Sequence, residues 1–142
     1  MAKKVLVPID GSSQSDHALE HALEEFADDD ITVIHVIDPI DAGYTTSVGM
    51  PGGSQEWYDN AQKEADALFE EAQEVADEYG VTLDTAEEMG RPSRTIVEYA
   101  EDEGFDQIVM GSHGRSGVSR ILLGSVAENV VRRSPMPVTV VR

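Results

Sequence analysis

Short apolar runs alternate with longer amphipathic segments along this 142-residue chain, and this alternation most constrains its fold. The runs are rich in Val and Ile and lie between turn-forming residues, which is typical of buried strands. Predicted strands cover 4–9, 31–37, 81–87, 106–110 and 138–141, and predicted helices cover 13–26, 55–79, 92–104 and 125–133. Strands and helices that alternate in this way form βαβ units, so we expect an α/β fold with a five-stranded parallel sheet.

Length and composition favour one domain. A chain of 142 residues has ordinary single-domain size, so we expect a single three-layer α/β/α domain over 1–142. No apolar run approaches the roughly eighteen residues of a transmembrane helix, and the N-terminal segment is too short for a secretory signal. We therefore expect a cytoplasmic protein with no membrane association. The chain has no cysteine, which excludes disulfides, thiol catalysis and cysteine-based zinc sites.

Local signals predict where the helices begin and end. Ser13 is expected to cap the first helix, with Asp16 three residues later. Gly80 is expected to end the second helix, and Pro92 suits the first turn of the third. The segment 38–54 is long, irregular and rich in Gly and Pro, so we interpret it as a flap near a site or as a disordered loop.

Acidic residues dominate the chain, with 28 Asp and Glu against 10 Lys and Arg and a net charge of −18. Such a surface argues against general nucleic-acid binding, which requires cations that neutralise phosphates. It resembles the solvated surface of a halophile's protein, and an acidic docking face is the alternative. Residues 111–142 are different, because they carry one acid, Glu128, and five arginines. An anion would be favoured there.

The same C-terminal quarter carries a glycine pattern. Gly111 and Gly114 follow the apolar run 108–110, and Gly124-Ser125 come after nine further residues. Glycine at a strand exit lets the chain turn sharply and lets a ligand approach the main chain. The N–H groups of Gly124 and Ser125, beside a helix start, would attract an anion such as phosphate. The alternative is a glycine-rich turn that only joins a strand to a helix.

Other nucleotide-binding motifs are missing from the sequence. There is no G-x-x-x-x-G-K-[ST] and no lysine after Lys63, which excludes a Walker-type loop. No G-x-G-x-x-G follows the first strand, so a Rossmann dinucleotide site is not expected. Phosphoryl transfer needs a cation clamp and a group that positions the nucleophile. The motif supplies too little for that, so we favour binding without rapid turnover and assign no catalytic residue.

Several stretches together carry a family resemblance. They are 5–12 with Ser15 and 18–19, then 90–92, 106–111, the G-x2-G-x9-G-[ST] pattern, 124–131 and 134–138. Over essentially the whole chain they resemble the universal stress protein family, in its ATP-binding branch. The resemblance implies the adenine-nucleotide alpha-hydrolase-like fold with sheet order 3-2-1-4-5, whereas alternation alone also allows 2-1-3-4-5. In the implied order, ligands bind beyond the carboxyl ends of the first and fourth strands, where the sheet reverses direction.

The resemblance also implies an ATP site. Asp10 and Val36 would face the adenosine, Met110 and Gly111 would lie beside the ribose, and the later motif residues would hold the phosphates. The implied binding residues are Pro8, Asp10, Val36, Met110, Gly111, Gly114, Gly124, Ser125 and Val126. Because the loop offers few positive charges, Mg²⁺ or Mn²⁺ would assist, held mainly by phosphate oxygens.

Each implied contact has a structural alternative. Asp10 can be a turn former before Gly11, Val36 can be core, and Ser125 can cap the last helix. The residues that would meet either phosphate or only solvent are His113, Arg115 and Arg120. His17 and His21 have a spacing that can bind metal but no evident third ligand, so a solvated face is favoured. Trp57 and Tyr58 are interpreted as packing residues rather than a stacking platform.

Three functions remain open on this evidence. The first is a nucleotide-binding regulator whose ATP occupancy alters its association with an unknown protein partner. The second is a slow ATPase or phosphate-transferring enzyme, and the third is a dimeric interaction module without nucleotide. In the 3-2-1-4-5 order the last strand is a short, apolar sheet edge, and such edges favour pairing with another chain. We therefore expect a homodimer through Val138, Thr139, Val140 and Val141.

Overall fold

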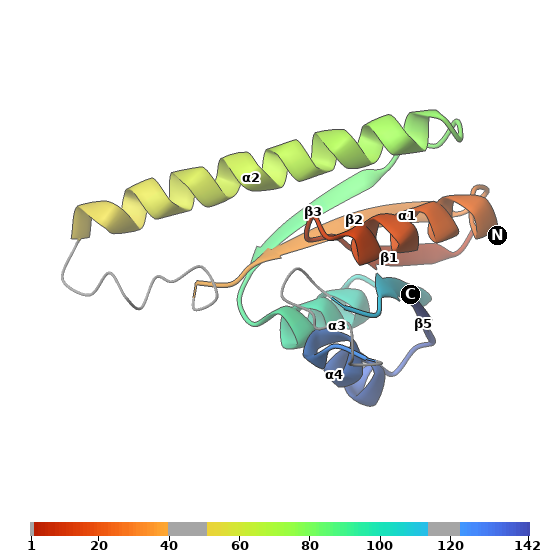
Figure 1. Ribbon diagram of the computed structural model, residues 1–142. Coiled ribbons are helices and arrows are strands. Elements are labelled where there is room, and N and C mark those ends of the chain that lie inside the picture. Colours follow the sequence, from red (N-terminus) through yellow and green to blue (C-terminus); the bar gives the residue numbers. More distant parts are fainter. Residues whose placement is uncertain (1, 40–50, 114–122) are drawn as a thin grey trace.

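The computed structural model describes residues 2–39, 51–113 and 123–142, which form a parallel sheet with helices on both faces (Figure 1). The strands are β1 (Lys4–Pro8), β2 (Asp30–Ile37), β3 (Asp84–Met89), β4 (Gln107–Gly111) and β5 (Val138–Val141). The helices are α1 (Ser13–Glu25), α2 (Pro51–Asp77), α3 (Pro92–Asp102) and α4 (Ser125–Arg133). The strand order is β3-β2-β1-β4-β5 with every neighbouring pair parallel, which confirms the order 3-2-1-4-5.

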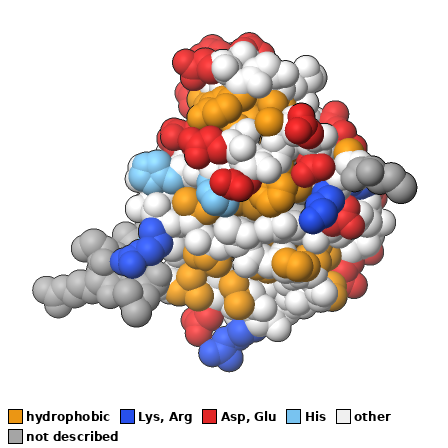
Figure 2. Space-filling model, turned by 90° about the vertical axis from the view of Figure 1, so that its right-hand side faces the viewer, with side chains coloured by type: hydrophobic (Ala, Val, Ile, Leu, Met, Phe, Trp, Pro, Cys, Tyr) orange, Lys and Arg blue, Asp and Glu red, His pale blue; other side chains and the backbone are white. Residues whose placement is uncertain are grey.

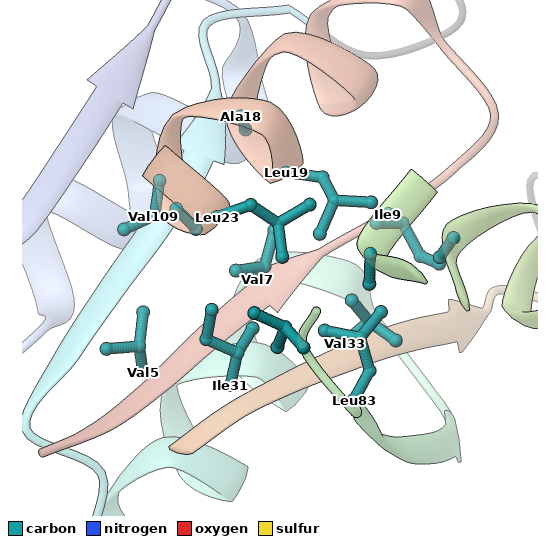
Figure 3. Packing of buried hydrophobic residues seen from close by; sticks show 14 residues of the cluster. Val5, Val7, Ile9, Ala18, Leu19, Leu23, Ile31, Val33, Leu83 and Val109 are labelled. Atoms are coloured by element: carbon teal, nitrogen blue, oxygen red, sulfur yellow. The ribbon is translucent and has the colours of Figure 1, made fainter. Parts of the chain in front are cut away.

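The sheet separates two apolar clusters because successive strand residues point to opposite faces. One face packs against α1 and α2, and the other packs against α3 and α4 (Figure 1). Figure 3 shows the first cluster, in which Val5, Val7, Ile31, Val33 and Val109 meet Ala18, Leu19 and Leu23 of α1. The second cluster includes Leu6, Ile34, Ile108, Ile96, Val97, Ala127 and Val130. Burial on both faces explains why the three central strands, β1, β2 and β4, are nearly continuous apolar runs.

The junction between β1 and β4 is the shortest seam in the sheet. β1 pairs with β2 from Lys4 to Pro8, whereas the β1–β4 register contains only Val5↔Gln107 and Leu6↔Ile108. Both strands continue past these pairs, so they separate toward their carboxyl ends. The sheet reverses its order at this seam, and the separation opens a crevice there.

The third strand lies later in the chain than the sequence predicted. Val81 and Leu83 are buried in the first cluster but precede the ladder, which begins at Asp84. The Gln73 side chain replaces a strand partner for this stretch, because its amide donates to the Val81 carbonyl at 3.0 Å and accepts the Leu83 N–H at 3.0 Å. Apolar alternation therefore extended the predicted strand into a segment that is paired by a side chain.

Two helix starts also differ from the prediction. The N-cap of α1 is Ser12, whose hydroxyl accepts the Ser15 N–H at 3.1 Å, so Ser13 is wrong as the cap. Helix α2 begins at Pro51, because proline suits the first helical turn, and not at residue 55. The last four residues of the predicted irregular segment 38–54 are therefore helical, and the interpretation of 40–50 as a flap lies outside the described residues.

Acidic side chains gather on part of one face of the molecule (Figure 2). In Figure 2, Asp and Glu side chains surround hydrophobic ones in the upper part of one face. Two ion pairs occur among the described residues, Arg94–Glu98 at 2.9 Å and Arg132–Glu128 at 3.0 Å, and both join exposed side chains one helical turn apart. Pairs of this kind contribute only a few tenths of a kcal/mol each, ~0.3–0.5. No described helix is long and apolar enough to cross a membrane.

Candidate functional site

A cavity of about 940 Å³ lies at the carboxyl edge of the sheet, at the seam between β1 and β4. Strand ends from β1, β2 and β4 form its floor, and the starts of α3 and α4 together with one side of α2 form its walls. The implied binding residues that line it are Pro8, Asp10, Val36, Met110, Gly111, Gly124, Ser125 and Val126. Gly114, Arg115 and Arg120 lie outside the described residues. The structure thus gathers these eight residues, and their contacts with a ligand stay predictions.

The first turn of α4 presents main-chain N–H groups at one end of the cavity. The helix is capped by Gly124, and its first internal hydrogen bond runs from the Glu128 N–H to the Gly124 carbonyl at 2.9 Å. The N–H groups of Ser125, Val126 and Ala127 precede that bond, so they have no acceptor within the helix. Together with the helix dipole they give this part of the cavity a partial positive charge that favours anions, and we refer to it as the candidate anion site.

Two expectations about this turn are wrong. The Gly124 N–H donates to the Ser112 carbonyl at 2.6 Å, so this group is engaged inside the protein rather than offered to a ligand. Ser125 is the first helical residue and not the cap, because the cap position belongs to Gly124. The Ser125 side chain is exposed, which leaves its hydroxyl at the mouth of the candidate anion site.

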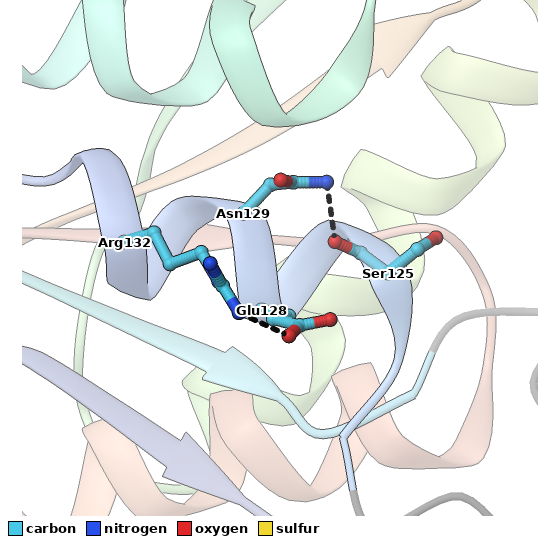
Figure 4. A network of polar contacts seen from close by, with 4 residues as sticks. All are labelled: Ser125, Glu128, Asn129 and Arg132. Carbon is cyan, nitrogen blue, oxygen red and sulfur yellow. Dashed lines mark hydrogen bonds and ion pairs between the residues drawn. The ribbon is translucent and has the colours of Figure 1, made fainter.

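The polar side chains of α4 are paired along the helix (Figure 4). Asn129 donates to the Ser125 carbonyl at 2.9 Å, and Arg132 pairs with Glu128. Glu128 does not line the cavity, whereas Asn129 does. The one carboxylate of the C-terminal quarter is therefore held by an arginine on the helix surface.

Ser112 is a central residue that the sequence interpretation missed. It is 1% exposed, its N–H donates to the Val141 carbonyl at 2.8 Å, and its carbonyl accepts the Gly124 N–H. Its hydroxyl is 2.9 Å from Nδ1 of His113. Ser112 therefore connects the end of β4, the end of β5 and the start of α4, and its position inside the glycine motif was the available signal.

Gly111 is required by packing. A Cβ at this position would lie 2.7–2.8 Å from the backbone carbon, carbonyl oxygen and Cβ of Gln14 in α1. Real Cβ contacts are never that short, and backbone atoms cannot rotate away. The glycine therefore allows α1 to lie against the end of β4, in addition to any ligand contact.

Asp10 has the turn-forming role that was its alternative. One carboxylate oxygen accepts the Ser12 N–H at 2.9 Å, and the Asp10 N–H is 3.4 Å from the Ser15 hydroxyl. Gly11 follows with φ of +84°, a conformation that favours glycine. Asp10 is half-buried and also lines the cavity, so the turn holds its carboxylate at the edge of the site.

Val36 lines the cavity from β2, which lies on the other side of β1 from β4. In a parallel ladder the N–H and C=O of one residue point toward the same neighbouring strand, and successive residues point toward the two neighbouring strands in turn. The Ile34 carbonyl accepts from Ile9 of the β1 side, and the Ile37 carbonyl accepts from Gly90 of the β3 side. Val36 therefore directs its N–H and C=O toward β1, whose pairing with β2 has already ended at Pro8↔Ile34. Its side chain is half-buried, packs against the second apolar cluster and also lines the cavity, so a core role and a ligand contact remain compatible.

The wall formed by α2 and the start of α3 was not predicted as part of the site. It contains Trp57, Asn60, Ala61 and Glu64 from α2, with Arg91 and Pro92 at the start of α3. Trp57 is half-buried and faces the cavity, so it does more than pack within the helix layer. The signal for this wall was the helical spacing of residues 57, 60, 61 and 64.

The described lining is acidic on balance. Its formal charges are the carboxylates of Asp10, Asp38 and Glu64 and the guanidinium of Arg91. His17 and His21 lie elsewhere on α1, and no group of three or more metal-binding side chains occurs among the described residues.

A doubly wound parallel sheet with a cavity at its switch point defines the class of α/β proteins in which ligands bind at that position. The model of the universal stress protein family matches residues 1–142. Universal stress protein MJ0531 of Methanocaldococcus jannaschii is 39% identical over 145 residues, which cover 99% of this chain and 82% of that protein. The chain therefore belongs to the universal stress protein family.

Solved structures show the same relationship. The structure of MJ0577 has a TM-score of 0.84 and 34% identity, covering 99% of this chain and 96% of that one. A universal stress protein solved in complex with cAMP has a TM-score of 0.69 and 27% identity, covering 99% and 96% of the two chains.

Proposed function

We propose that this protein binds ATP in the switch-point cavity and acts as a nucleotide-dependent regulator. The observation that carries the proposal is that one cavity is lined both by the N-terminus of α4 and by a main-chain edge of Val36 that, among the described residues, forms no rung with β1. The first suits phosphate, and the second suits a planar base with adjacent donor and acceptor. The likeness to a family member solved with cAMP supports an adenine nucleotide.

The Val36 edge favours adenine over 6-oxopurines. A main-chain N–H can donate to N1 of adenine, while the C=O accepts from the 6-amino group. Hypoxanthine carries N1–H and O6 instead, so both pairs would be mismatched. An unsatisfied buried polar group costs about 1–3 kcal/mol, so ITP should bind at least tenfold more weakly than ATP.

The charge of the lining supports metal assistance. The triphosphate meets the N–H groups of α4 but also three carboxylates around the described cavity. Mg²⁺ or Mn²⁺ bound mainly to phosphate oxygens would reduce that repulsion, and Mg²⁺ commonly binds in this way. We therefore propose that ATP binds as its metal complex, with no dedicated protein cage for the ion.

Two measurements test the proposed function. Small molecules released by denaturing the purified protein should include an adenine nucleotide, and calorimetric titration of the nucleotide-free protein should show ATP binding that weakens without divalent metal. No nucleotide and no binding at millimolar ATP would favour the interaction-module alternative. A turnover assay on the ATP complex distinguishes a regulator, which holds ATP, from a slow ATPase.

A homodimer through β5 completes the proposal. β5 is the sheet edge, and each of its four residues remains partly exposed in the isolated chain. Two such edges can pair across a twofold axis. The Ser112 N–H to Val141 hydrogen bond connects this edge to the start of α4 through Ser112, so nucleotide occupancy has a direct structural route to the dimer surface.

A further inference from the structure

A buried histidine lies at the point where β1 and β2 separate. His35 is 9% exposed, lines the cavity and belongs to β2, immediately before Val36. Its Nδ1 is 2.9 Å from the carbonyl oxygen of Ile9, the residue that follows β1. A carbonyl only accepts hydrogen bonds, so Nδ1 must carry the proton and donate. The Ile9 contact thus fixes both the tautomer and the orientation of the ring.

The Ile9 carbonyl is also the acceptor that the ladder would use next. The last rung between the two strands is the bond from the Ile9 N–H to the Ile34 carbonyl at 2.8 Å. In a parallel ladder the following rung would join the Val36 N–H to the Ile9 carbonyl. Among the described residues that rung is not formed, and the His35 ring holds the carbonyl instead.

We propose that His35 is a positioning residue of the nucleotide site, which stops the β1–β2 ladder one rung early. By donating to the Ile9 carbonyl, it keeps the N–H of Val36 available to the base. The identity of the base rests on the proposed function, whereas the strand-opening step does not. If the imidazole is removed, the buried Ile9 carbonyl loses its donor, and the Val36 N–H is the donor nearest along the ladder.

Amide hydrogen exchange and binding on the full-length chain test this role with two variants. His35→Leu removes the donor, whereas His35→Asn retains an N–H at the same number of bonds from Cβ as Nδ1. In the nucleotide-free parent, the Val36 amide should exchange faster than that of Ile34. His35→Leu should slow Val36 exchange at least tenfold and weaken ATP binding about tenfold, the effect of one good hydrogen bond. His35→Asn should restore both properties toward the parent.

Inorganic tripolyphosphate provides the matched control, because it uses the α4 end of the cavity alone. Its affinity should be the same in the parent and in His35→Leu. Equal weakening of ATP and tripolyphosphate, without rescue by His35→Asn, would mean that His35 only supports the fold and would overturn the proposal. Unchanged Val36 exchange with unchanged ATP affinity would overturn it as well.

The ring tautomer gives a test that needs no variant. Nitrogen NMR of the parent at alkaline pH should show the Nδ1–H form of His35, and the Nε2–H form would refute the proposed contact even if His35→Leu fails to fold. Failure of the proposed function is distinguishable, because the parent would then not bind ATP while Val36 exchange would still respond to His35→Leu.

Discussion

Replacing Gly111 with alanine should destabilise the fold through a single methyl group. The new Cβ would lie 2.7–2.8 Å from three atoms of Gln14, whereas carbon atoms in contact prefer about 3.5–4.0 Å. Relief requires α1 and the end of β4 to separate by roughly 1 Å, and overpacking of this kind costs about 1–3 kcal/mol. Gly→Ala also reduces the entropy of the unfolded chain, which returns about 0.4–1 kcal/mol. The net loss should be about 1–2 kcal/mol.

Thermal denaturation followed by circular dichroism measures this loss. For a chain of 142 residues the unfolding entropy is about 0.3 kcal/mol/K, so the midpoint of Gly111→Ala should fall by about 3–7 °C. Gly80→Asn is the control, because φ there is +70°, no atom lies within 4 Å of an added Cβ, and asparagine tolerates this conformation. Its midpoint should stay close to that of the parent. If Gly111→Ala is as stable as the parent and loses only ATP affinity, the packing explanation is refuted and the ligand explanation takes its place.

The other predictions concern the candidate anion site, the charged surface and the sheet edge. Gly124→Val should lower ATP affinity at least tenfold by calorimetry while the melting temperature changes little; unchanged affinity in a folded variant would mean that the site is misplaced. The melting temperature of the parent should rise from about 0.1 M to about 3 M KCl, because salt screens the repulsion among the acids, and a flat curve would contradict this. Burial, followed by the nearby Glu20 carboxylate, raises the pKa of Asp16 above 3.8. The folded state then holds the proton more tightly than the unfolded state, so ionisation of Asp16 removes stability as pH rises. The melting temperature of Asp16→Asn relative to the parent should therefore increase with pH, and a constant difference would refute the assignment. Val140→Lys should give monomers by light scattering with helix content retained, whereas a persistent dimer would place the contact elsewhere.

Much of this fold could be predicted because the three central strands, β1, β2 and β4, are buried on both faces and leave a clear apolar signal. The bounds of α4 and β5 were predicted correctly, since Gly124 and the prolines 135 and 137 mark them in the sequence. The start of β3 was misplaced because Val81 and Leu83 are as apolar as strand residues, while their pairing depends on Gln73, a distant side chain.

Part of the site could be predicted from local sequence signals as well. Motif glycines mark places where the chain turns, so the ends of β1 and β4 and the start of α4 were found together. Hydrogen bonds between residues far apart in the chain leave no pattern in the local sequence. The engagement of the Gly124 N–H by Ser112 and of the Ile9 carbonyl by His35 depends on tertiary placement, as does the wall that Trp57 contributes.

The two-pair seam between β1 and β4 gives the molecule a mechanical property. β3, β2 and β1 form one well-paired half of the sheet, and β4 with β5 forms the other. Residues of both halves line the cavity, so a bound molecule that touched Asp10 and Met110 together would act as a strut across the seam. Ligand binding would then change how readily the two halves of the sheet move about the β1–β4 seam. The mobility of β5, at the outer edge of the sheet, would change with it.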